Sequence, residues 1–131
     1  DLEVRPGGAV MCAGYEYYGG SSDHFYAEVS PTGVMTNIVG YGTSYDEEIT
    51  GMAKDAQGGV YHTGSWGTAT GTQIDTRRLC AGGSEWACLW PDAPTGDYEP
   101  TAIAVSGVNA YVVGYRWGAA LQDQVVVGHV Y

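Results

Sequence analysis

Apolar residues alternate with polar ones in short runs along the whole chain, and clusters of Gly, Pro, Asp and Ser separate these runs. Alternation with a period of two is typical of β-strands that bury one face. No segment repeats its apolar residues at the three-to-four-residue spacing of an amphipathic helix. The pattern therefore predicts an all-β protein of about ten or eleven short strands.

Three segments share a strand pattern that ends in a glycine. They are AVMCAGY at 9–15, GVYHTGS at 59–65 and AYVVGYR at 110–116. Their glycines, Gly14, Gly64 and Gly114, are separated by fifty residues in both cases. A shorter apolar run and a turn precede each segment, which predicts a hairpin because the turn leaves no room for a crossover helix. We expect each glycine where the backbone bends or another strand approaches closely.

After this strand, each unit continues through a loop to a third strand that begins at or just after an acidic residue. These third strands are expected at 23–30, 85–92 and 123–131. In the first unit, a Pro-Thr-Gly turn leads to a fourth strand at 34–41. The second unit has room for only a short fourth strand or none, and the third unit stops at its third strand. We therefore divide a single domain, residues 1–131, into units of approximately 1–48, 49–99 and 100–131.

Four antiparallel strands in each forty to fifty residues match the blade of a β-propeller. A β-sandwich has turns at similar intervals. The repetition favours the propeller, because blades around an axis face equivalent neighbours and keep equivalent residues. The predicted fold is thus about three blades, each a four-stranded antiparallel meander, in an arc that is open or completed by self-association. A strand from another chain, or the N-terminal segment, is expected to complete the last sheet.

The segments SSDHFYAEVSPTGVMTNIVGYGTSYDEEITGMAKDAQGGVYHTGS and AGGSEWACLW resemble a bacterial propeller-repeat family, often labelled seven-bladed β-propeller (SBBP-type) repeats. The resemblance covers most of the chain and rests on the order of its parts: an acidic-aromatic strand, the Pro-Thr-Gly turn, a Gly-rich strand, the DEE link and an Asp-x-x-Gly turn. The chain departs from it at the end of the second unit and in the turn at 106–109. The resemblance implies a secreted or cell-surface bacterial protein whose repeats form a scaffold without assigned chemistry.

Acidic residues outnumber basic ones by fifteen to five, which gives a formal net charge of −10. Such a surface repels phosphate backbones, so we expect no nucleic-acid partner. The charge suits cations or a basic protein surface, and it also keeps a protein soluble. No apolar stretch approaches the length that spans a bilayer, so no membrane insertion is expected. The chain starts at Asp1 without a charged-then-apolar leader, from which we expect a processed or engineered start.

A candidate recognition face follows from the residues next to the three glycines. The aromatic residues that follow them are Tyr15, Tyr17, Tyr18, Trp66, Tyr115 and Trp117. In a meander, the loop after the second strand and the link to the next unit emerge at the same edge. These links hold Asp46, Glu47 and Glu48, and later Asp97 and Glu99. Aromatic rings stack on sugars or bury at protein contacts, and carboxylates accept sugar hydroxyls or coordinate calcium. Alternatively, the aromatic residues pack between blades and the acids are solvated links.

Cysteine and histidine positions bear on disulfides and metal sites. Cys80 and Cys88 flank an interval that a hairpin could close with a disulfide, and two buried free thiols are the alternative. Cys12 lies in an apolar strand, either as a small buried residue or as the origin of an intermolecular bond. His24, His62 and His129 are far apart in the sequence and are expected to be packed strand residues. Because no Cys and His cluster has zinc spacing, the sequence predicts no metal site beyond calcium at the acidic face.

The sequence contains no nucleophile elbow, phosphate-binding loop or zinc-protease motif, so no enzyme is predicted. The first hypothesis is a secreted structural or binding module that self-associates through its open blade ends into a ring or a filament. The second is a carbohydrate-binding propeller that uses Trp66, Trp117 and Tyr17. The third is a glycosidase-like enzyme with paired carboxylates. The expected partners are therefore further copies of the chain, a glycan or another protein.

Overall fold

The computed structural model describes residues 1–80, 83–90, 96–117 and 124–130, and the side chains of residues 1–36, 38–79 and 96–117. Regular structure in these ranges consists of eleven β-strands and no helix. Consequently, no helix in the described ranges is long and apolar enough to cross a membrane. The predicted all-β class and the predicted number of strands are confirmed.

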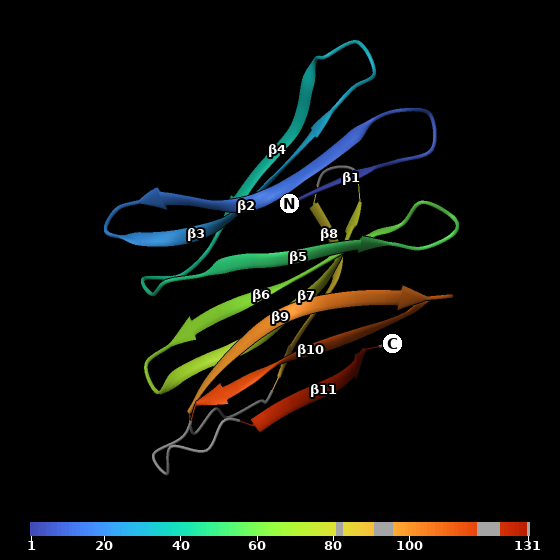
Figure 1. Cartoon of the computed structure of the whole chain (residues 1–131). Coiled ribbons are helices and arrows are strands. Elements are labelled where there is room, and N and C mark those ends of the chain that lie inside the picture. Colours follow the sequence, from blue (N-terminus) through green and yellow to red (C-terminus); the bar gives the residue numbers. More distant parts are fainter. Residues whose placement is uncertain (81–82, 91–95, 118–123, 131) are drawn as a thin grey trace.

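The strands form three antiparallel sheets, and each strand pairs with its neighbours in the sequence. The first sheet contains β1 (Leu2–Val4), β2 (Val10–Tyr18), β3 (Ser21–Val29) and β4 (Met35–Tyr41). The second contains β5 (Glu48–Lys54), β6 (Val60–Thr68), β7 (Gly71–Cys80) and β8 (Gly83–Trp90). The third contains β9 (Asp97–Ser106), β10 (Asn109–Trp117) and β11 (Gln124–Val130). Figure 1 shows the sheets stacked in chain order, with the N-terminal sheet at the top and the C-terminal sheet at the bottom.

The second sheet differs from the prediction in its third and fourth strands. β7 occupies residues that were expected to form a loop, and most of the segment expected as the third strand, 85–92, instead belongs to the fourth strand, β8. The expectation of a short or missing fourth strand is therefore wrong. The sequence hides β7 because Gln73, Asp75 and Thr76 are polar and yet buried. Polar residues that are satisfied inside a fold remove the apolar alternation by which a strand is recognised.

The N-terminal segment belongs to the first sheet. Residues of β1 pair with β2 in the register Leu2 to Cys12 and Val4 to Val10. In addition, the Asp1 carboxylate accepts a hydrogen bond of 3.0 Å from the backbone N–H of Met52 in the second sheet. The expectation that this segment could complete the last sheet is thus wrong.

The three repeated glycines lie in the middle of β2, β6 and β10 rather than at strand ends, as the prediction had it. A side chain at Gly64 would collide with the carbonyl oxygen of Glu48, and one at Gly114 with the carbonyl oxygen of Glu99. Both collisions involve the preceding strand, close to a shift in the pairing register. At Gly14, by contrast, no described atom lies within 4 Å of an added Cβ. Close approach of a neighbouring strand therefore accounts for two of the three glycines.

Gly64→Ala is expected to lower the free energy of unfolding by about 2 kcal/mol or more, because the new Cβ must displace the backbone of Glu48. Gly14→Ala is the matched control in the same repeat position. It has open space, so we expect a change within about 0.5 kcal/mol or a small gain from the stiffer unfolded chain. Urea unfolding measures both variants, and equal losses would show that the close contact does not explain Gly64.

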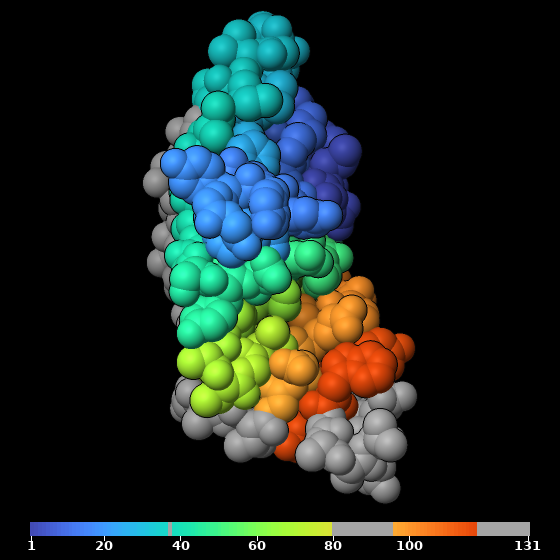
Figure 2. All heavy atoms as spheres, turned by 90° about the vertical axis from the view of Figure 1, so that its left-hand side faces the viewer, coloured from blue at the N-terminus to red at the C-terminus, as the bar shows by residue number. Residues whose placement is uncertain are grey.

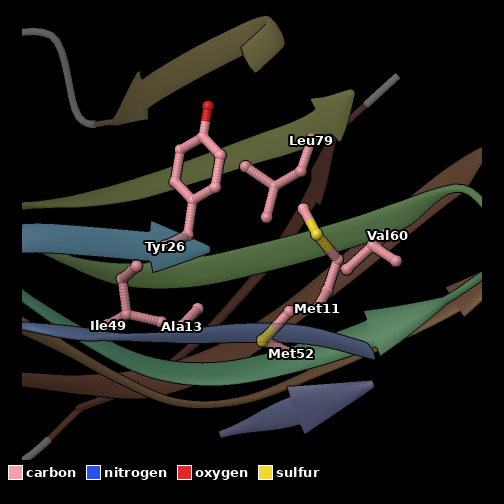
Figure 3. Packing of buried hydrophobic residues seen from close by; sticks show 7 residues of the cluster. All are labelled: Met11, Ala13, Tyr26, Ile49, Met52, Val60 and Leu79. Carbon is pink, nitrogen blue, oxygen red and sulfur yellow. The ribbon is translucent and has the colours of Figure 1, made fainter. Parts of the chain in front are cut away.

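The main hydrophobic core lies between the first and second sheets. Its buried residues are Met11, Ala13, Tyr26, Ile49, Met52, Val60 and Leu79 (Figure 3). A smaller core joins the second sheet to the third through Tyr61 and Ala110, with Ile103 and Val105 packed against them. Side chains alternate along a strand. Odd-numbered residues of β2 and β6 thus face the following sheet, and even-numbered residues of β6 and β10 face the preceding one.

Candidate functional site

One edge of the molecule gathers the segments that were predicted to form a recognition face. The β2–β3 turn, the β4–β5 link and the β6–β7 turn lie on the same side in Figure 1, and Figure 2 views the molecule from that side. Most of the predicted aromatic residues here are well exposed. Tyr17 and Tyr18 are 75% and 77% exposed at the end of β2. Tyr115 and Trp117 lie at the end of β10 with ring centroids 6.5 Å apart. Tyr15 is also exposed.

Trp66 does not belong to this exposed set. Its ring is half-buried and stacks on Tyr41, with the centroids 6.3 Å apart and the ring planes 26° apart. The guanidinium carbon of Arg77 lies 5.1 Å from the Trp66 ring centroid. The alternative interpretation, in which the aromatic residues pack between sheets, is therefore correct for Trp66.

The three acidic residues predicted in the first link take different environments. Asp46 is exposed and accepts hydrogen bonds from the backbone N–H and the hydroxyl of Ser22, at 2.9 and 3.2 Å. Glu47 is fully buried and accepts hydrogen bonds from the backbone N–H and the hydroxyl of Thr43. Glu48 is exposed at the start of β5. Glu47 thus shapes the link, and its predicted place on the recognition face is wrong.

A pocket of about 230 Å³ opens between the second and third sheets. It is lined by Glu48, Thr50, Ser65, Thr72, Asp97, Tyr98, Glu99 and Trp117. The indole N–H of Trp117 donates to a carboxylate oxygen of Glu99 at 3.3 Å. The hydroxyl of Thr72 fixes the two sheets to each other: it donates to the carbonyl of Tyr98 at 3.0 Å and accepts from its N–H at 2.7 Å. Carboxylates, hydroxyls and an aromatic ring thus meet in one concave place.

Equivalent positions fifty residues apart differ in exposure at the third sheet. Ala13 and Thr63 are 6% and 0% exposed, whereas Val113 is 36% exposed. This face of the third sheet also carries Tyr115 and a shallow apolar pocket of about 180 Å³ between β9 and β10. We call it the outer face of the third sheet.

The first sheet has an apolar face on the opposite end of the stack. This face carries the side chains of Leu2, Val4 and Met35, which are 59%, 48% and 54% exposed. It also carries the half-buried side chains of Val10 and Cys12. The strand register sets these residues on one side, because Leu2 pairs with Cys12 and Val4 with Val10. We call this the outer face of the first sheet.

Cys12 carries a free thiol. The predicted Cys80–Cys88 disulfide is not found, and the backbone register explains why. Cys80 lies opposite Gly83, whereas Cys88 lies opposite Thr76, which precedes Cys80 by four residues in β7. Four residues of strand span about 13 Å, which exceeds the roughly 7 Å that a disulfide allows between Cα atoms. The side chains of both residues lie outside the described set.

Between the first and second sheets, the structure brings together His24 from β3, His62 from β6 and Asp75 from β7. All three are fully buried, and one ligand atom of each lies within 4.8 Å of the others. His24 Nε2 lies 3.1 Å from the carbonyl oxygen of Ser65. His62 Nε2 lies 2.7 Å from the hydroxyl of Tyr41.

The charges in this cluster are set by burial and by Arg77. Burial lowers the pKa of His62 to about 3, so its ring is neutral at pH 7. Burial alone would raise the pKa of Asp75, but its contacts with His24, His62 and Arg77 hold that pKa below the usual value. Arg77 Nε donates to a carboxylate oxygen of Asp75 at 2.7 Å. Burial also raises the pKa of Tyr41, which keeps its hydroxyl protonated.

This cluster is not evident from the sequence. His24 and His62 were correctly expected to be packed strand residues, but their distance along the chain hid their proximity. Asp75 lies on the strand that was read as a loop. If β7 is taken as a strand, its pairing with β6 places Asp75 opposite Gly64. Gly64 is two residues from His62 and therefore on the same face of the sheet. His129, the third histidine, lies in β11, where only the backbone is described.

A scan against models of protein families and a search of curated proteins find no match to this chain.

Proposed function

We propose that the chain is a non-catalytic module of propeller-type blades that self-associates: the outer face of the third sheet packs on the outer face of the first sheet of a second copy. The observation that carries this proposal is the difference in exposure between positions that repeat every fifty residues. The resemblance to bacterial propeller repeats supports a secreted or cell-surface setting.

The outer face of the third sheet contains a repeat position that is buried in the first two sheets. Ala13 and Thr63 bury against the next sheet in the chain, and Val113 occupies the same position in β10. The exposed apolar surface at Val113 is therefore suited to pack on another sheet, as the equivalent positions of the first two sheets do.

The outer face of the first sheet contains a repeat position that is buried in the second and third sheets. Val60 and Ala110 are 1% and 0% exposed because they pack on the sheet that precedes them. Val10 is their equivalent in β2, and it is surrounded by the exposed side chains of Leu2 and Val4. The first sheet of one copy thus offers the same kind of surface that the second and third sheets use inside the chain.

A contact between two different faces is heterologous. Such contacts close into a ring when the rotation between copies allows it and otherwise continue into a filament. Two copies with three sheets each would give a ring of about six blades, within the usual range for propellers.

Val113→Asp is expected to weaken the association about 100-fold or more, because the contact would bury an unpaired charge. Val108→Asp is the matched control, since Val108 is 68% exposed in the β9–β10 turn and away from both faces. Light scattering over a concentration series measures the mass of each variant. A wild-type chain that stays monomeric at every concentration contradicts the proposal.

Val4→Asp provides the complementary variant on the other face. Alone, it should dissociate the assembly as Val113→Asp does. A mixture of the two variants should form a one-to-one complex that does not grow further, because each variant retains the face that the other has lost. If Val4→Asp has no effect, the contact joins two copies of the same face and the head-to-tail arrangement is wrong.

The pocket between the second and third sheets favours a second candidate function, carbohydrate binding. Of the residues first expected to contact sugar, Trp66 is packed inside and Tyr17 does not line the pocket, so Trp117 carries this function. Its ring offers a stacking surface, and Glu48, Asp97 and Glu99 offer acceptors for sugar hydroxyls.

Trp117→Ala is expected to weaken glycan binding about tenfold or more on an array, because the stacking ring is lost. Tyr18→Ala is the control, since Tyr18 is exposed and lies outside the pocket. Equal binding by both variants would reject the pocket as a sugar site. Release of shortened glycan would instead support the glycosidase-like reading and contradict a non-catalytic module.

A further inference from the structure

We propose that His24, His62 and Asp75 bind one divalent transition-metal ion between the first and second sheets, and that zinc is the ion best suited to them. The proposal is independent of self-association. It rests on how these three side chains are held and on which of their atoms are left without a partner.

The separation of the donors fits a metal site that closes slightly on binding. One ligand atom of each residue lies within 4.8 Å of the other two. Zinc bonds of about 2.0–2.2 Å in a tetrahedral arrangement place donors about 3.3–3.6 Å apart. A movement of about 1 Å or less for each side chain would therefore bring the donors into range.

Each residue of the cluster has one buried polar atom without a hydrogen-bond partner and a second polar atom that contacts a neighbouring group. Among the described residues, the buried atoms without a hydrogen-bond partner include His24 Nδ1, His62 Nδ1 and Asp75 Oδ1. The other polar atoms, His24 Nε2, His62 Nε2 and Asp75 Oδ2, contact Ser65, Tyr41 and Arg77. This is the arrangement of metal ligands whose second atoms are oriented by surrounding groups. Buried polar atoms without partners are otherwise costly.

The contact between His24 and Asp75 requires either a proton or a metal ion between the two groups. The carbonyl oxygen of Ser65 can only accept a hydrogen bond, so the proton of a neutral His24 ring lies on Nε2. In that tautomer, Nδ1 carries a lone pair and lies 3.3 Å from Asp75 Oδ2, and the two acceptors repel each other. A metal ion coordinated by both groups removes this repulsion.

Two imidazoles and one carboxylate form a donor set that suits zinc and neighbouring divalent metals better than calcium or magnesium. Arg77 lies beside Asp75 and opposes a second cation, so we expect weaker binding than at a site without this guanidinium. Since His24 belongs to the first sheet and the other two ligands to the second, the ion would stabilise the packing of these sheets.

The test uses the whole chain, freed of metal with a chelator and then given one equivalent of zinc chloride. X-ray absorption is expected to report only nitrogen and oxygen ligands, at about 2.0–2.1 Å, with the outer scattering of two imidazoles. Nitrogen NMR should show that zinc shifts the Nδ1 signals of His24 and His62. Sulfur at about 2.3 Å would place zinc on the cysteines and overturn the proposal.

Competition with a coloured chelator compares the variants. His62→Gln is expected to lose at least about 100-fold in zinc affinity, whereas His129→Gln, which removes the histidine outside the cluster, should bind as the wild type does. Equal affinity of the two variants, or no retention of zinc at micromolar concentration, overturns the proposal. If His62→Gln fails to fold, the absorption and NMR spectra of the wild-type chain decide. A His24 ring that carries protons on both nitrogens and does not respond to zinc would also overturn it.

Discussion

Arg77→Met is expected to lower the free energy of unfolding by about 3–5 kcal/mol. Arg77 Nε donates to Asp75 at 2.7 Å, and the two side chains are only 14% and 0% exposed. The guanidinium also lies 4.0 Å from the ring centroid of Tyr41. Without Arg77, the buried carboxylate loses its nearest compensating charge. Urea unfolding at pH 7, with a chelator present so that bound metal does not contribute, measures the loss.

Lys54→Met is the matched control at the surface. It removes an ion pair of 3.4 Å between Lys54 and Glu3. The Lys54 side chain is 42% exposed and the Glu3 side chain is 24% exposed. We expect this variant to lose less than about 1 kcal/mol, because water screens the pair. Adding Asp75→Asn to Arg77→Met should recover part of the loss, since the unpaired charge is then absent. Equal losses for Arg77→Met and Lys54→Met would show that the buried pair does not stabilise the fold more than the exposed pair does.

Lowering the pH from 7 to 4 is expected to destabilise the fold on the order of 3 kcal/mol through His62 alone. The unfolded chain protonates this ring below a pKa of 6.5, whereas burial lowers the pKa in the folded chain to about 3. Between these values the unfolded state binds more protons, so stability is present near neutral pH and is lost as the pH falls. Chemical unfolding of the metal-free chain across this range measures the effect.

His62→Gln separates this contribution from that of the many carboxylates. The variant has no ring to protonate, so its free energy of unfolding should fall less steeply as the pH is lowered. The difference in free energy of unfolding between wild type and variant should therefore shrink on the order of 3 kcal/mol from pH 7 to pH 4. A difference that stays constant over this range would mean that His62 does not titrate as its burial implies.

The sequence predicted the meander architecture because alternation and turn residues are local signals. The glycine repeat marked β2, β6 and β10 correctly, although the strands continue past Gly14, Gly64 and Gly114. β7 was missed because burial in this strand depends on polar partners from other strands. Gln73, Asp75 and Thr76 look like loop residues until those partners are known.

The edge that was expected to form a recognition face was predicted in part, for a related reason. Topology correctly brought the aromatic ends of the strands and the acidic links to one edge of the molecule. Topology alone does not predict which tryptophan is accessible: Trp117 lines a pocket, whereas Trp66 packs on Tyr41. Nor does topology reveal that Thr43 satisfies Glu47 inside the fold. Residue type gives the chemistry that is available, and only the packing decides whether it faces solvent.

The meander topology has a consequence for how such a protein can change in evolution. In the part of the chain that the structure describes, every strand pairs only with a sequence neighbour in its own sheet, and each sheet ends before the next begins. Duplication or deletion of one unit of about fifty residues at a link would leave the strand pairing of all other sheets intact. The gene can therefore lengthen or shorten its array in whole units. The equal spacing of Gly14, Gly64 and Gly114 is consistent with duplication of such a unit.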